Sequence, residues 1–377
     1  MFDRVLILSA SAGAGHVRAA QAIEKAFIQL NAAGELKNID TLQYTNKLFE
    51  KLYSKAYIEL VDKAPDLLGW LYNHLDNPWR FERRRLAFDK LNARPFIKLL
   101  EDYQPDLAVC THFLPAEIIS WLKQKKGLAT RQAIIVTDFD LHAMWLCRYY
   151  EHYFVALEET KLHLQALGVP PEKITVSGIP VDPVFAEHKD KIEMRKKLGL
   201  DTDLPAILTS AGGFGVGPME MLIQSLMKMR NKVQVIAVCG RNEELKNRLD
   251  KFTEQLDTKS TVKIVPVSYT TQMDEYMSAA DLLLGKPGGL TTSEALAKNL
   301  PIVIVHPIRG QEERNSDHLL EEGAAIRCNN LPVLAYKIDK LLDSPERIDK
   351  MRANVRRLAR PTAAVDIVKK ILSLRNR

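Results

Sequence analysis

The sequence predicts an α/β protein made of two similar, doubly wound parallel-sheet domains that face a central cleft. Short apolar runs alternate with stretches of helical periodicity, and most of these runs are apolar on both faces. The same unit of strand, glycine loop and helix also opens both halves of the chain. Strands buried between two layers of helices are typical of parallel sheets. The length of 377 residues agrees with two domains.

The first half of the chain repeats this alternation several times. An apolar run at 4–9 leads into a glycine loop, after which apolar residues recur at helical spacing up to Leu30. Further strands are expected at 36–40, 107–110, 133–137, 153–155 and 174–177, with helical stretches between them. We therefore predict a first domain over residues 1–195.

The second half has the same organisation. A charged, helix-prone stretch at 187–197 and a turn-like segment at 201–205 come first. Strands are then expected at 206–209, 233–239, 262–265, 282–284 and 302–305. We predict a second domain over residues 203–345 and a basic helix over residues 346–377.

The charge of the chain is concentrated in two segments. The net charge is +6, yet residues 78–98 have seven basic side chains against two acidic ones, and residues 345–377 have ten against three. The rest of the chain is therefore net acidic. This distribution argues against a uniformly basic nucleic-acid-binding protein and favours a localised anionic partner.

Cysteine spacing and hydropathy exclude further classes of protein. Cys110, Cys147, Cys239 and Cys328 lie far apart, which suggests neither a zinc site nor a disulfide framework, so we expect reduced thiols in an intracellular protein. No apolar run approaches the roughly 18–20 residues of a membrane-spanning helix. The apolar start of the chain is interpreted as a buried strand and not as a signal peptide.

The first glycine loop ends at a helix start. Gly13 and Gly15 allow the backbone to approach a ligand, and the free N–H groups there favour an anion or a polar substrate. His16 can act near neutral pH, although it could equally be a histidine that only hydrogen-bonds its own loop. A dinucleotide signature is incomplete because position 18 is arginine, although Asp40 could mimic the ribose-binding acid.

Two glycine loops in the second half favour a nucleoside diphosphate site. The loop at 211–217 has more glycines than a tight turn needs, which favours close approach of a phosphate group over a turn alone. The loop at 286–294 joins Gly288, Gly289 and the Thr291 hydroxyl at a helix start. Glu294, one turn later, can accept both hydroxyls of a ribose, or it could simply be a helix N-terminal carboxylate stabilised by the dipole. The glycines of the first of these loops are Gly212, Gly213, Gly215 and Gly217.

Polar residues also follow the strand at 302–305. Gln311, Glu312 and Asn315 lie beyond its carboxyl end, where open α/β sheets bind ligands. They could hydrogen-bond a sugar, or they could form a polar surface loop.

A second polar cluster follows the strand at 133–137 in the first half. It contains Asp138, Asp140, His142 and Trp145. No matching motif elsewhere would complete a metal site, so we interpret it as an acid/base or substrate-orienting cluster. Thr111 and His112, after the strand at 107–110, point to the same place.

Taken together, these segments resemble the lipid glycosyltransferases with the GT-B fold of two Rossmann-like domains. The monogalactosyldiacylglycerol synthases and processive diacylglycerol glucosyltransferases are the nearest resemblance, and the N-acetylglucosaminyltransferase that forms lipid II is a more distant one. Coverage extends from Val5 to about Asn330. The chain departs from the pattern in its first loop, where relatives commonly have three adjacent glycines, and at Glu313 and Arg314, which replace smaller residues. The matching segments are 11–22, 103–106, 137–138, 142–145, 177–183, 211–217, 239–242, 286–296, and 310–312 with Asn315.

The resemblance implies an inverting, metal-independent transfer of a hexose from a UDP-sugar to a membrane-lipid hydroxyl, with diacylglycerol as the expected acceptor. The donor would bind the C-terminal domain and the acceptor the N-terminal one, with no cofactor. Inversion needs a single displacement, so a base must take the acceptor proton while the leaving UDP is stabilised. The basic C-terminal helix is expected to return to the N-terminal domain, as family tails do.

The implied roles fall on three groups of residues. His16 is the candidate base, or the residue that orients the acceptor, with Asp106 or Asp138 as its carboxylate partner. The donor would be held by Gly212, Gly213, Gly215, Gly288, Gly289 and Thr291 at the diphosphate, Glu294 at the ribose, and Gln311, Glu312 and Asn315 at the hexose or uridine. The candidates for acceptor or membrane contact are Gly13, Gly15, His142, Trp145, Trp79, Arg80, Arg83, Arg84 and Arg85.

A lipid acceptor requires contact with a bilayer. Aromatic and apolar residues between 67 and 88 are interleaved with arginines, a composition suited to the headgroup layer of an anionic membrane, although it could also be a solvated basic helix face. We expect a peripheral enzyme on the cytoplasmic face of the cell membrane, without a nucleic-acid partner.

Two other functions fit the same pattern. A UDP-sugar 2-epimerase on this fold would convert its substrate without lipid, and a catalytically silent sensor would bind a UDP-sugar and consume none. His16, Asp138 and the basic aromatic segment favour transfer over both.

Overall fold

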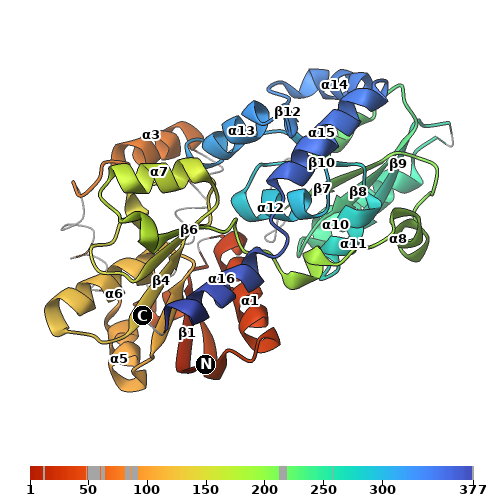
Figure 1. Cartoon of the computed structure of the whole chain (residues 1–377). Helices are drawn as coiled ribbons and strands as arrows, with labels where there is room; N and C mark the ends of the chain where they lie inside the picture. The colour runs from red at the N-terminus through yellow and green to blue at the C-terminus, as the bar shows by residue number, and fades with distance from the viewer. Residues whose placement is uncertain are drawn as a thin grey trace.

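The polypeptide forms two six-stranded parallel sheets, each with helices on both faces (Figure 1). The structure is a computed structural model, and it describes all residues except 12, 48, 50–59, 61–63, 81–85, 87–91, 212–218, 258 and 376–377. The strand order is β2-β1-β3-β4-β5-β6 in the first sheet and β12-β11-β10-β7-β8-β9 in the second. The predicted α/β class with two doubly wound sheets is therefore confirmed.

The first sheet follows from the short apolar runs of the N-terminal half. All four residues of β3 and of β5 are buried, as expected for strands covered on both faces. Its strands are β1 (Phe2–Ser9), β2 (Ala33–Asp40), β3 (Leu107–Cys110), β4 (Arg131–Ile135), β5 (His152–Val155) and β6 (Ile174–Val176). The helices of this half are α1 (Ala14–Gln29), α3 (Pro65–Leu75), α5 (Arg94–Tyr103), α6 (Phe113–Lys126) and α7 (Glu158–Ala166), with 3-10 turns η1 (Thr41–Tyr44), η2 (Ala143–Trp145), η3 (Pro171–Lys173) and η4 (Pro183–Ala186).

The second sheet repeats this arrangement. All six residues of β8 are buried, which places this strand in the centre of the domain core. Its strands are β7 (Ala206–Ser210), β8 (Val233–Val238), β9 (Val262–Val267), β10 (Leu282–Gly285), β11 (Ile302–Ile304) and β12 (Ala325–Arg327). The helices are α8 (Lys191–Lys197), α9 (Met219–Leu226), α10 (Glu243–Glu254), α11 (Met273–Ala279), α12 (Gly289–Ala297), α13 (Gln311–Glu321), α14 (Leu334–Leu342) and α15 (Pro345–Leu358), with a 3-10 turn η5 (Leu331–Val333).

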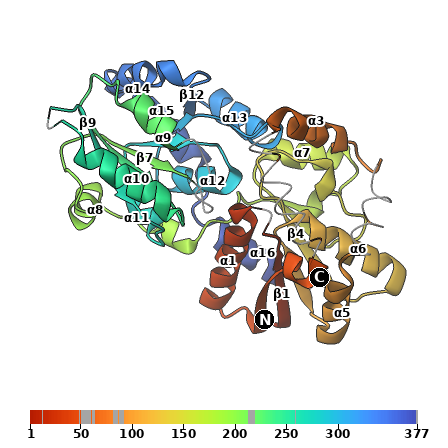
Figure 2. The same ribbon diagram turned by 180° about the vertical axis from the view of Figure 1, so that it is seen from behind.

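The basic C-terminal segment divides between the two domains. Met351 and Val355 of α15 belong to the apolar core of the second domain. The last helix, α16 (Ala363–Leu374), lies along α1, and its Ile367 and Ile371 join Phe27 in the core of the first domain (Figures 1 and 2). The chain thus crosses between the domains twice.

The two crossings touch each other at Gly178. This glycine has a φ of +81°, and a Cβ atom there would lie 2.6 Å from Cβ of Arg360 on the return crossing. A side chain at this position would therefore strain the backbone, and it would also push apart the two segments that cross between the domains.

Helix α3 of the first domain contacts the second domain through ion pairs at both of its ends. It lies next to α13 in both views (Figures 1 and 2). Asp66 at its start pairs with Arg309 at 2.9 Å, and Asp76 after its end pairs with Arg314 at 2.7 Å. An apolar cluster that joins Phe139 and Ile179 to Leu290 of α12 adds to the contact between domains.

Candidate active site

The carboxyl ends of the two sheets face each other, so the glycine loops that follow β1 and β10 meet. A Cβ atom on Gly15 would lie 3.9 Å from Cβ of Leu290, in the first turn of α12. Gly289, the first residue of α12, packs so closely on the backbone of Thr137 that a side chain there would collide with its carbonyl oxygen. These glycines bring backbone from both domains to one place, the location predicted for the site.

His16 lies in the first turn of α1 with a fixed orientation. Its Nδ1 is 3.0 Å from the carbonyl oxygen of Thr111 and 2.9 Å from Oγ1 of Thr137. Because a carbonyl oxygen can only accept, Nδ1 holds the proton of the neutral ring and Nε2 keeps its lone pair. Burial lowers the pKa of His16 to about 4, so the ring is neutral at pH 7. Nε2 is thus an available proton acceptor.

The structure does not join Asp106 to His16. Asp106 precedes β3 and accepts a hydrogen bond from the Arg4 backbone N–H at 2.7 Å, whereas His16 contacts Thr111 beyond the other end of that strand. Five residues of extended chain span about 16 Å. The expectation that Asp106 is the carboxylate partner of His16 is therefore corrected, since Thr111 and Thr137 hold Nδ1 instead.

Asp138 is next to Thr137 in the buried floor of the interdomain contact. Its Oδ1 accepts a hydrogen bond from Nε2 of Gln311 in the second domain at 2.8 Å. Burial raises the pKa of Asp138 to about 6, against the opposing effect of the Gln311 hydrogen bond. Asp138 therefore lies beside the histidine site but shares no hydrogen bond with His16.

The start of α12 has buried polar atoms without partners. No described residue hydrogen-bonds Oγ1 of Thr292 or Oε2 of Glu294, and Thr291 lies in the same helical turn. Oε1 of Glu294 accepts a hydrogen bond from Arg18 of α1. Burial raises the pKa of Glu294 to about 7, although Arg18 opposes the shift. Gly288 is the N-cap of this helix, and the predicted phosphate residues Gly212, Gly213 and Gly215 lie outside the described residues.

The residues of α13 that are predicted to bind the sugar all form hydrogen bonds with other protein groups in this arrangement of the domains. Asn315 is fully buried, and it accepts from the Phe139 N–H while donating to the Pro287 carbonyl, both at 3.1 Å. Oε2 of Glu312 accepts from the Ile308 N–H at 2.7 Å, and burial raises the pKa of Glu312 to about 7. This turn of α13 is therefore part of the contact between the two domains.

Two predicted acceptor residues have structural partners. Nδ1 of His142 accepts from the Met144 N–H at 3.1 Å, and its Nε2 donates to the carbonyl of Tyr72 in α3 at 2.9 Å. Both ring nitrogens are thus occupied, so His142 fixes α3 and has no nitrogen left for an acceptor. Trp145 is 2% exposed, and its ring lies 6.4 Å from that of His16, behind the site.

Part of the predicted membrane segment lies on the surface. Leu67 and Trp70 of α3 are exposed, and Trp79 is partly exposed with the Arg148 guanidinium 4.2 Å from its ring centroid. Arg80 follows in the same turn. Arg83, Arg84 and Arg85 lie outside the described residues.

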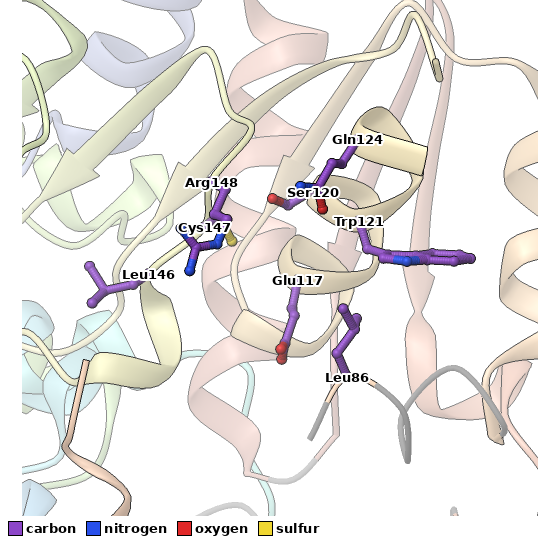
Figure 3. A pocket seen from close by; sticks show the side chains of 8 residues that line it. All are labelled: Leu86, Glu117, Ser120, Trp121, Gln124, Leu146, Cys147 and Arg148. Atoms are coloured by element: carbon purple, nitrogen blue, oxygen red, sulfur yellow. The ribbon is translucent and has the colours of Figure 1, made fainter. Parts of the chain in front are cut away.

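A pocket lies on the first domain, between α6 and the loop after η2. Its side chains come from α6 and from the loop after η2, together with Leu86, as Figure 3 shows. The pocket therefore belongs to the predicted acceptor domain and not to the contact between domains. It is lined by Leu86, Glu117, Ser120, Trp121, Gln124, Leu146, Cys147 and Arg148.

Several residues near the site were not among the predicted ones. Arg18 pairs with Glu294, and Arg314 donates to Asp76 and Asp140 while its guanidinium lies over the Tyr72 ring. The only sequence signal for Arg314 was its departure from the family pattern. Nothing local in the sequence links Tyr72 or Asp76 to α13.

The described residues contain neither a metal-binding cluster nor a membrane-spanning helix. Within the described part of the chain, no group of three or more His, Cys, Asp or Glu side chains could hold a metal ion. No helix built from those same residues is long and apolar enough to cross a bilayer.

Comparison with known families assigns both halves of the chain. Residues 16–181 match the monogalactosyldiacylglycerol (MGDG) synthase family, and residues 190–358 match the glycosyl transferases group 1 family. The gap between the two matches, residues 182–189, contains η4 and ends just before α8, where the chain first crosses between the domains.

Solved structures with the same fold cover nearly the whole chain. Acinetobacter baumannii MurG superposes with a TM-score of 0.64 at 17% identity, covering 98% of this chain and 99% of that one. Anabaena Alr3699/HepE in complex with UDP gives 0.58 at 14% identity, covering 98% and 100%. UDP-GlcNAc 2-epimerase from Neisseria meningitidis gives 0.60 at 14% identity, covering 98% and 99%. At these identities the likeness concerns the fold alone, and it confirms the predicted GT-B architecture.

Curated relatives identify the family. The processive diacylglycerol beta-glucosyltransferase of Bacillus subtilis is 27% identical over 98% of this chain and 94% of its own length. The protein of the same name from Bacillus mycoides is 30% identical over 98% of this chain and 93% of its own length. These matches confirm the resemblance found in the sequence: the chain belongs to the processive diacylglycerol beta-glucosyltransferase family and is a glycosyltransferase.

Proposed function

We propose that this glycosyltransferase moves glucose from UDP-glucose to the hydroxyl of diacylglycerol, with inversion at the anomeric carbon and without a metal ion. The relatives' name supplies the acceptor, the sugar and the β linkage. A β product from the α-linked donor requires inversion. Alr3699/HepE, which shares the fold, was solved with UDP and with UDP-glucose, which supports this donor class.

The observation that favours transfer most is the state of His16. The Thr111 carbonyl holds the ring proton on Nδ1, so Nε2 can remove the proton of an acceptor hydroxyl. The oxygen then attacks the anomeric carbon as the bond to the β-phosphate oxygen of UDP breaks. The proton goes to His16, and the bonding electrons leave with UDP.

Stabilisation of the leaving diphosphate is assigned to the start of α12. Backbone N–H groups at a helix N-terminus and the positive end of the helix dipole favour a developing anion. Gly288 and Gly289 lie at this helix start, and Thr291 adds a hydroxyl in its first turn. The unpartnered Oε2 of Glu294, one turn further on, suits a ribose hydroxyl as donor.

The acceptor places the enzyme at a membrane surface, and we propose peripheral binding at the cytoplasmic face. Leu67, Trp70 and Trp79 provide exposed apolar groups on the first domain, and the basic stretch that begins at Arg80 complements anionic lipids.

The test is incubation of the enzyme with radiolabelled UDP-glucose and diacylglycerol vesicles, followed by lipid extraction and chromatography. Transfer predicts labelled glucosyl lipid. Conversion of the UDP-sugar without lipid would indicate the epimerase alternative, and tight UDP-glucose binding without any consumption would indicate the sensor.

A further inference from the structure

His112 is a second histidine beside His16, and its tautomer is fixed as well. It is the N-cap of α6, directly after Thr111, and its Nδ1 accepts the Leu114 backbone N–H at 3.0 Å. Because Nδ1 uses its lone pair there, the proton of the neutral ring is on Nε2. Burial holds the pKa of His112 well below its usual range, so the ring stays neutral at physiological pH.

The two histidines therefore present opposite functions. His16 has a lone pair on Nε2, whereas His112 has an N–H at the same ring position. Their ring centroids are 4.6 Å apart, and the rings are inclined at 82°. Among the residues that the structure describes, none hydrogen-bonds Nε2 of either ring. His112 as a residue is 1% exposed, and its Nε2–H has no acceptor within the described part of the chain.

We propose that His112 contacts the substrate: its Nε2–H donates to the acceptor hydroxyl oxygen whose proton is taken by His16. This inference rests on the proposed function, because the hydroxyl is that of the lipid acceptor. A hydroxyl is both a donor and an acceptor, and a neighbouring pair of opposite tautomers satisfies both capacities. A cap for α6 alone needs only Nδ1, and serine or asparagine would provide it equally well.

The contact restricts the rotation of the acceptor oxygen. One lone pair of the oxygen accepts from His112 and the O–H bond points to His16, which leaves the other lone pair for the anomeric carbon. Orientation of this kind raises the rate of transfer without a new covalent step. The tautomer cannot reverse cheaply, because the Leu114 N–H would then face a second N–H.

The informative variant is His112→Asn. An asparagine oxygen can still accept the Leu114 N–H, so α6 keeps its cap, but no N–H remains where Nε2 was. In assays with UDP-glucose and diacylglycerol vesicles, we expect kcat/KM for the lipid to fall on the order of tenfold to a hundredfold. The affinity for UDP and the Tm should stay unchanged, and slow hydrolysis of UDP-glucose by water should fall much less than transfer. His112→Ala, which also removes the cap, should lower the Tm in addition.

Transfer by His112→Asn within twofold of the wild-type rate would overturn the proposal. An equal loss of transfer, donor hydrolysis and Tm would also overturn it, because that pattern indicates a structural role only. Failure of the proposed function is distinguishable, since the wild-type enzyme itself would then form no glucosyl lipid.

Discussion

Arg18 and Glu294 form an ion pair across the two domains, although they are 276 residues apart in the chain. Arg18 lies one half-turn after His16 on α1, and Glu294 lies on α12, where the donor ribose is proposed to bind. The side chain of Glu294 is 2% exposed, and its second oxygen has no partner among the residues that the structure describes. Glu294, which we assign to the donor ribose, therefore also binds Arg18 of the first domain when the two domains are in contact.

Replacement of Arg18 by methionine should weaken this contact. A buried carboxylate without a counter-charge must either take up a proton or become hydrated, and hydration requires the domains to separate. We expect a larger radius of gyration in small-angle X-ray scattering, and a return to the wild-type value when UDP is added. Lys25→Met is the matched control, because it removes a more exposed pair between α1 and Asp182. A scattering curve for Arg18→Met that matches the wild type would contradict this prediction.

Asp138 should make the stability of the protein depend on pH. Its pKa in the folded state is about 6, above the ordinary value of 3.8, so the folded protein binds this proton more tightly than the unfolded chain does. The stabilisation from this group is complete below about pH 4 and is lost as the pH rises through about 6. A shift of about two units corresponds to roughly 3 kcal/mol at most.

Asp138→Asn should therefore gain in Tm relative to the wild type at pH 8 and gain less at pH 5, because the amide needs no proton to be neutral. Its oxygen can still accept from Gln311. Thermal unfolding at both pH values measures the difference. A gain that is the same at both pH values would show that burial does not raise the pKa of Asp138.

Membrane contact is expected to depend on α3. A double replacement, Leu67→Ser with Trp70→Ser, removes two exposed apolar side chains and should lower partitioning into anionic vesicles at least about tenfold. Vesicle sedimentation at low and high salt measures the change. Tyr336→Ser on α14 is the control, since this exposed side chain belongs to the donor domain. Equal binding by all three proteins would exclude α3 from the contact surface.

The pH dependence of transfer reports on His16. A base must be unprotonated to act, and burial sets the pKa of His16 at about 4. As far as this group is concerned, kcat/KM should stay level between pH 8 and about pH 5 and decrease as the pH falls through 4. A decrease centred near pH 6.5, the ordinary value for histidine, would mean that the His16 ring is solvated.

Local sequence patterns predicted most of the fold. Alternating apolar runs and helical periodicity located the strands, and the glycine loops correctly indicated where backbone from the two domains would meet. The position of Asp106 was also readable, because a residue just before a parallel strand lies at the edge opposite the ligand site. Asp106 is a carboxylate, a residue type that suits a histidine partner, but its position before β3 puts it at the far end of the strand from His16.

Contacts between the domains could not be predicted from local sequence patterns. Gln311 and Asp138 are 173 residues apart, and Phe139 and Asn315 are 176 apart. No periodicity or spacing relates residues on two separate sheets, because their distance depends on how the domains pack. The same holds for the tautomers of His16 and His112, which depend on backbone groups brought in by the fold.

The central claim is that Nε2 of His16 removes the acceptor proton. The most direct test compares wild-type turnover with that of His16→Ala under saturating UDP-glucose and diacylglycerol, with UDP affinity measured in parallel. We expect turnover to fall by a factor on the order of 10² to 10⁴ while UDP affinity stays nearly intact. A variant that retains more than about a tenth of wild-type turnover would contradict the account.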